Sequence, residues 1–159
     1  MSSENTIRHL LKKFYGLHAT GKKGSEIVHL DRDGATIQPV KMIRVALGVA
    51  DTAGGVLAWL NPEQSAIQII NFQIDITTAA TGGTCTLDFG AAANATTSSD
   101  TLIDGVNSAS AAIKDQASAG TTLHDEVAEG AYITGSKKTG AAAGQAGFAY
   151  ITYAAIAGT

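Results

Sequence analysis

The segment Gly16–Lys23 comes within one residue of a phosphate-binding loop. Its sequence, Gly-Leu-His-Ala-Thr-Gly-Lys-Lys, has both glycines and the first lysine of that motif, but Lys23 stands where a hydroxyl should bind magnesium. The motif also needs a strand before it and a helix after it, so that backbone N–H groups point at phosphate. Here a predicted helix precedes the segment and a polar stretch follows, so we expect no nucleotide binding.

The histidines and the single cysteine, Cys85, do not have the spacing of a metal site. The histidines are scattered along the chain, at His9, His18, His29 and His124. A zinc site would need ligands from unrelated segments. Residues 124–126, His-Asp-Glu, are adjacent, so their side chains would point in different directions, and no serine or cysteine elbow of a hydrolase accompanies them. We therefore predict no enzymatic activity and no cofactor.

Oxygen ligands for calcium gather around one loop. Asp88, Asp100 and Asp104 lie around the stretch Asn94–Gly105, which is rich in serine and threonine. Such oxygens are the ligands that calcium prefers, although the spacing does not match a helix-loop-helix calcium site. More often, side chains of this kind hydrogen-bond to their own backbone and stabilise turns. A calcium site stays open as the less favoured interpretation.

The charges are distributed unevenly along the 159 residues. The chain has 11 Lys and Arg against 14 Asp and Glu, a net charge of −3. Residues 1–44 carry eight basic and four acidic residues, whereas the remainder carries three basic and ten acidic ones. A basic arm on an acidic body favours contact between the arm and an acidic partner, which is a protein or nucleic acid. Attraction between arm and body is the alternative explanation.

Residues 1–34 are predicted to form an N-terminal arm that contains a short amphipathic helix. The helix is expected from about Asn5 to Tyr15, with Gly16 as its stop, and eleven residues make it marginal unless its apolar face is covered. From Leu17 to Gly34 the pattern indicates a linker. The residues expected to bind the partner are Ile7, Arg8, Leu10, Leu11, Lys12, Lys13, Phe14, Lys22 and Lys23.

Residues 35–159 are predicted to form an all-β body. Ile70, Phe72, Ile74 and Ile76 alternate with polar residues, which is typical of a half-buried antiparallel strand. A second strand with Cys85, Leu87 and Phe89 inward follows after a turn, and the two strands look like a hairpin. Further strands are expected over residues 126–134 and 148–156, separated by a flexible basic loop at 135–144. Six to eight short strands favour a two-sheet antiparallel sandwich of jelly-roll type.

The composition narrows the class of protein. It includes 18 Gly, only 2 Pro and only 16% charged residues, so Ala, Gly, Ser and Thr must cover much of the surface and suit close contacts with other chains. No apolar stretch approaches the roughly 20 residues of a membrane span, and Met1–Gly16 is charged where a signal peptide is apolar. One cysteine suits synthesis in a reducing cytoplasm. Trp59 is expected to anchor the core, with a binding surface as the alternative.

Several segments together resemble small proteins encoded among the head genes of tailed bacteriophages. The resemblance spans roughly Val49 to Ile156 and does not cover the arm. It rests on Trp59–Glu63, Ile67–Thr78, Ala93–Gly105, Gly130–Ser136 and Gly147–Ile151. It implies a capsid decoration, or cement, protein that sits on the outside of the virion and binds the major capsid protein. It also implies self-association as a homotrimer, and it supplies no catalytic residues.

A second class of function stays open. The same sandwich could serve as a head-fibre, tail or baseplate module whose loops bind a host carbohydrate or receptor. Clustered exposed aromatic side chains would favour this class, and the candidates are Trp59, Tyr132, Tyr150 and Tyr153. We expect no specific nucleic acid and no membrane among the partners.

Overall fold

The computed structural model describes residues 29–30, 36–37, 39–115 and 125–156. The chain divides into two units, residues 1–39 and 40–159. In the first unit, β1 (His29–Leu30) pairs antiparallel with β2 (Thr36–Ile37). The helix predicted over residues 5–15, and the arm residues expected to bind a partner, lie outside the described residues.

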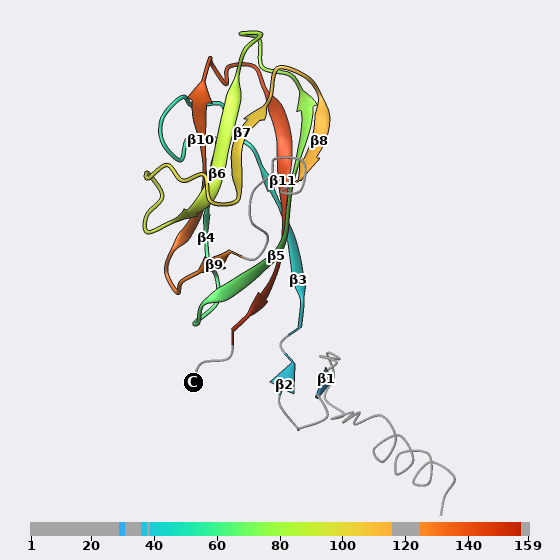
Figure 1. Ribbon diagram of the computed structural model, residues 1–159, viewed down its shortest axis with the longest axis vertical. Helices are drawn as coiled ribbons and strands as arrows, with labels where there is room; N and C mark the ends of the chain where they lie inside the picture. Colours follow the sequence, from blue (N-terminus) through green and yellow to red (C-terminus); the bar gives the residue numbers. More distant parts are fainter. Residues whose placement is uncertain (1–28, 31–35, 38, 116–124, 157–159) are drawn as a thin grey trace, which may run out of the picture. The chain divides into compact units, whose positions relative to one another are not determined.

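The second unit is built from two antiparallel sheets that form separate layers (Figure 1). The five-stranded sheet has the order β3, β11, β5, β8, and β9 also pairs with β5. Its strands are β3 (Lys41–Ala46), β5 (Ile67–Thr78), β8 (Ala112–Asp115), β9 (Glu126–Val127) and β11 (Ala146–Ala155). The four-stranded sheet has the order β4, β10, β6, β7. Its strands are β4 (Leu57–Leu60), β6 (Thr86–Ala92), β7 (Ile103–Asn107) and β10 (Tyr132–Thr139). No helix occurs among the described residues, and the predicted two-sheet antiparallel sandwich is confirmed.

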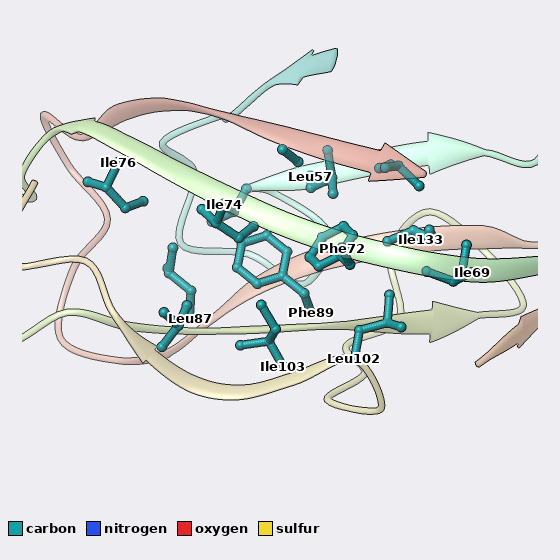
Figure 2. Packing of buried hydrophobic residues seen from close by; sticks show 14 of the residues in the cluster. Leu57, Ile69, Phe72, Ile74, Ile76, Leu87, Phe89, Leu102, Ile103 and Ile133 are labelled. Carbon is teal, nitrogen blue, oxygen red and sulfur yellow. The ribbon is translucent and has the colours of Figure 1, made fainter. Parts of the chain in front are cut away.

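The core lies between the sheets and is filled by aliphatic and aromatic side chains (Figure 2). Phe72 of β5 and Phe89 of β6 are fully buried, and their ring centroids lie 5.5 Å apart. The predicted inward residues Cys85, Leu87 and Phe89 are all buried, which confirms the alternation in β6. β5 and β6 belong to different sheets and face each other across the core. The predicted hairpin between them is therefore wrong.

Ile70 was predicted to point into the core, and a β-bulge in β5 makes this prediction wrong. Thr152 pairs with Asn71 and the next residue, Tyr153, pairs with Ile69, so Ile70 is an extra residue in β5. The extra residue shifts the side-chain alternation by one. Ile69 therefore points into the core, and Ile70 is exposed instead of buried.

Two further predictions about the second half of the chain are wrong. The single strand expected over residues 126–134 is two strands in different sheets, because a turn with Gly130 at φ 71° separates β9 from β10. The basic loop expected at 135–144 is strand as far as Thr139. Lys137 lies in that strand at 3.4 Å from Asp51, and Lys138 lies at 3.8 Å from Asp88. Backbone pairing of β10 with β6 makes this segment a strand, and carboxylates on neighbouring segments pair with both lysines.

Candidate functional site

One face of the sandwich is an exposed sheet surface with an unusual composition, here called the open face. It is the side of the five-stranded sheet that points away from the core. Its members alternate with the residues of β3, β11, β5 and β8 that point towards the core. They are Met42, Arg44 and Ala46 of β3, Phe148, Tyr150 and Thr152 of β11, Gln73 and Asp75 of β5, and Ile113 and Asp115 of β8.

The strand register sets these side chains in rows across the sheet. The first row is Ala46, Phe148, Asp75 and Ile113, and the second is Arg44, Tyr150, Gln73 and Asp115. A third row places Met42 beside Thr152 and Asn71. Cross-strand neighbours are in side-chain contact distance, so the aromatic rings of β11 form the centre of the open face.

Arg44 and Phe148 are joined by a cation–π contact within this face. The guanidinium carbon of Arg44 lies 4.4 Å from the centroid of the Phe148 ring. A contact at that distance stabilises an exposed pair by about 0.5–1 kcal/mol.

The corresponding face of the four-stranded sheet is partly covered by loops of the chain. The hydroxyl of Thr134 donates a 2.8 Å hydrogen bond to the carbonyl of Thr97, and the N–H of Gly54 donates a 2.9 Å hydrogen bond to the Ser136 hydroxyl. Both β10 side chains are buried as a result. The two sheets therefore differ: loops cover the outer side of one around β10, whereas the other presents aromatic and aliphatic side chains along several strands.

The exposure of the open face makes it the candidate interaction surface of the body. Met42 is 70% exposed and Ile113 is 62% exposed. An antiparallel sheet with one solvated side ordinarily carries polar residues there. Phe, Tyr, Met and Arg are the residue types enriched in protein interfaces, and apolar patches of this kind mark interaction sites. We identify the open face as the candidate functional site.

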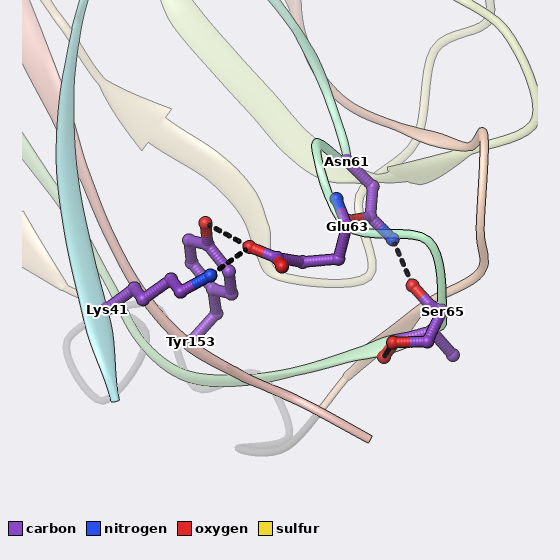
Figure 3. A network of polar contacts seen from close by, with 6 residues as sticks. Lys41, Asn61, Glu63, Ser65 and Tyr153 are labelled. Atoms are coloured by element: carbon purple, nitrogen blue, oxygen red, sulfur yellow. Dashed lines mark hydrogen bonds and ion pairs between the residues drawn. The ribbon is translucent and has the colours of Figure 1, made fainter. Parts of the chain in front are cut away.

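A polar network holds the first residue of β3 to the body (Figure 3). Oε1 of Glu63 accepts a 2.8 Å hydrogen bond from Lys41 Nζ and a 3.0 Å hydrogen bond from the Tyr153 hydroxyl. The hydrogen bond from Lys41 holds the pKa of Glu63 below its ordinary value. Burial first, and then the hydrogen bond to Glu63, raise the pKa of Tyr153 to about 12. This network thereby holds the start of β3 against Glu63 and Tyr153 of the second unit.

The proposed calcium ligands have a different partner in the structure. Lys138 forms ion pairs with Asp104 and Asp88, and Asp88 also accepts a 2.8 Å hydrogen bond from the N–H of Gly105. Burial raises the pKa of Asp88, while the hydrogen bond to Asp104 raises that of Lys138. An ammonium group thus occupies the position between two of the three carboxylates. In the part of the chain that is described, no group of three or more His, Cys, Asp or Glu side chains is arranged to hold a metal ion.

The structure also places the remaining candidate residues of the sequence, namely the cysteine, the tryptophan, Asp125 and the histidines. Cys85 is a fully buried free thiol. Trp59 packs at the margin of the core with its ring 5.4 Å from that of Tyr153, as expected for a core anchor. Asp125 accepts a hydrogen bond from Thr101. Residues 9, 18 and 124 lie outside the described residues, and His29 is in β1.

The open face was missed in the sequence, although a signal for it exists. The final strand was predicted, but Phe148 and Tyr150 lie on the opposite side from its buried residues Ala149 and Ile151. A strand that is apolar on both sides, in a sheet with one buried side, predicts an exposed apolar surface. Ile113 could not be found in this way, because β8 is short and its neighbours are weakly patterned.

Comparisons with protein-family models, with curated proteins and with solved structures find no match to this chain. Over the described residues, the structure contains no helix of the length and apolarity needed to cross a membrane.

Proposed function

We propose that this protein is a structural virion protein that decorates the outside of a tailed-phage capsid and stabilises contacts between capsomers. The observation that carries a protein-binding role is the open face, where Met42 and Ile113 are highly exposed beside aromatic side chains. The resemblance to head-gene proteins adds the major capsid protein as a partner, which the arm contacts. In this proposal the body is a sandwich of jelly-roll type, the protein acts by binding without catalysis, and it is made in the host cytoplasm.

In this proposal the arm binds the capsid and the body forms the contacts between copies of the protein. The arm, residues 1–34, docks on an acidic capsid surface through its basic residues and its apolar stripe, and it orders there. The body associates with two further copies as a homotrimer. A decoration protein binds the assembled shell and not its separated subunits, so it stabilises the assembled state by mass action. The shell then resists the internal pressure of its DNA at higher temperature.

Decoration of purified capsids tests the proposal. The full chain is added to expanded capsids that lack it, and its occupancy is measured by mass spectrometry of the sedimented particles. We expect saturable binding with symmetric density on the exterior in a reconstruction, and a higher temperature of DNA release from filled particles. Binding only to the inside of the shell would reject the proposed role. So would the absence of binding when the protein is added in large excess over its capsid sites.

The receptor-binding alternative is favoured by one observation, the aromatic pair Phe148 and Tyr150 on an exposed sheet. Aromatic rings on a flat surface can stack on sugars as well as on protein. Of the four candidates, Tyr153 is buried, whereas Trp59, Tyr132 and Tyr150 are half-buried, and Trp59 packs on the core. Virions without the protein that adsorb poorly to host cells, yet keep their thermal stability, would favour a head-fibre, tail or baseplate role.

A further inference from the structure

The open face is electrically polarised across its width. Arg44 lies on β3, the edge strand at one side, whereas Asp75 and Asp115 lie on β5 and β8 at the other side. The aromatic rings of Phe148 and Tyr150 lie on β11 between them. A surface with a basic edge, an apolar centre and an acidic edge is complementary to a copy of itself that is rotated about an axis parallel to the strands.

We propose that the open faces of three copies of this chain pack around such an axis, with the β3 edge of each copy beside the β8 edge of the next. Rotation about an axis parallel to the strands keeps each row at its own level. Arg44 of one copy then meets Asp115 of its neighbour in the second row. In the first row, the small side chain of Ala46 meets the large side chain of Ile113. Both rows are therefore complementary, in charge and in size.

The width of the sheet fits closure with three copies. Four strands about 4.8 Å apart make a face about 19 Å wide, and three such faces that close into a triangular prism leave about 5.5 Å between each face and the axis. The side chains of one sheet fill about 5 Å, because stacked sheets lie about 10 Å apart. The rings of Tyr150 and Phe148 would meet their symmetry mates at the axis and exclude water there. A cyclic arrangement of this kind is closed and does not grow into a fibre.

This inference rests on the homotrimer of the proposed function and names its contact face, but it does not depend on binding to a capsid. It also accounts for the contrast between the two sheets. Loops cover the outer side of the four-stranded sheet around β10 and bury Thr134 and Ser136, although Leu60 on its edge strand β4 is 45% exposed. The five-stranded sheet leaves Met42 and Ile113 to be covered by a neighbouring copy.

Charge reversal tests the contact between the two edges. The full chain and its variants are studied by sedimentation velocity, with circular dichroism as the check of folding. We expect the wild-type chain to be a trimer, Arg44→Asp and Asp115→Arg each to raise its dissociation constant at least tenfold, and the double reversal to restore it. Glu129→Arg, in the exposed turn between β9 and β10, changes the charge as Asp115→Arg does but lies off the open face, so it should leave the trimer intact.

A disulfide trap tests the geometry without relying on charge. The variant with Arg44→Cys and Asp115→Cys should form a covalent trimer on mild oxidation, and the buried native thiol of Cys85 should not compete. A wild-type chain that is a monomer or a dimer, or a trimer unaffected by either reversal and not trapped, would overturn the inference. A trimer that behaves as expected but does not bind capsids leaves the inference standing and rejects the capsid role. A protein that decorates capsids as a monomer rejects the inference and leaves the capsid role standing.

Discussion

The hydroxyl of Tyr153, near the end of the last strand, donates a 3.0 Å hydrogen bond to Oε1 of Glu63, in the connection between β4 and β5. The same oxygen accepts a hydrogen bond from Lys41, the first residue of β3. Three segments far apart in the sequence thus converge on one carboxylate oxygen. Tyr153 is 2% exposed, so this contact also closes one end of the core.

Tyr153 should make the protein lose stability in alkali. Its folded-state pKa is raised from 10.0 to about 12, so the folded chain holds the phenol proton more tightly than the unfolded chain. Its contribution is complete below pH 10 and is lost as the pH rises towards 12, by an amount on the order of 2 kcal/mol. Urea unfolding at pH 8 and pH 11 measures about half of this loss, because pH 11 lies midway between the unfolded-state and folded-state pKa values. In Tyr153→Phe the difference between the two pH values should shrink, whereas Tyr150→Phe serves as the control on the open face.

Gly135 should not tolerate a methyl group. An added Cβ would lie 2.4 Å from a ring carbon of Phe89 and 2.8 Å from Cβ of Leu57. Both neighbours are buried, so Gly135→Ala should destabilise the body by about 1–3 kcal/mol, as overpacked cores do. Gly82→Ala is the matched control, because its Cβ would find no atom closer than 3.7 Å. Equal unfolding temperatures for the two variants would contradict the packing described for β10.

Asp88 should act as a structural acceptor and not as a calcium ligand. Asp88→Ala removes the acceptor of the Gly105 N–H and should cost about 1–2 kcal/mol. Asp88→Asn keeps an oxygen at that position and should cost less, since burial of the ionised carboxylate is itself unfavourable, as its raised pKa indicates. Calcium should leave the unfolding temperature of the wild-type chain unchanged relative to magnesium, because Lys138 already pairs with the carboxylates. A rise specific to calcium, or capsid binding abolished by a chelator, would support the metal-site interpretation.

The arm should contribute to capsid binding and not to the folding of the body. Deleting residues 1–34 should leave the unfolding temperature nearly unchanged but weaken binding to expanded capsids, with the remaining affinity less sensitive to salt. Leu10→Asp combined with Phe14→Asp should have the same effect through loss of the apolar stripe. His124→Ala and Asp104→Ala are the comparison variants and should bind normally if they fold. A truncated chain that decorates capsids as tightly as the full chain at the same salt would show that the arm is no anchor.

The in-and-out pattern of the long strands could be predicted from the sequence alone. Alternation places Phe72, Ile74 and Ile76 on one side of β5, and Leu87 and Phe89 on one side of β6, and all five are buried in the structure. Period-two alternation is a local property, because successive side chains of a strand point to opposite sides whatever the strand pairs with. The class of fold follows from it, as does the choice of core residues.

Only the tertiary structure decided which strands pair and which surface stays open. Alternation is the same for a hairpin and for two strands that face each other across a core, so the placement of β5 and β6 in different sheets had no local signal. The bulge at Ile70 depends on its pairing with β11, and the strand conformation around Lys138 depends on the pairing of β10 with β6. The polarity of the open face has the same origin. Arg44 and Asp115 are 71 positions apart in the sequence, and they share a row only because the register of three strand pairs aligns them.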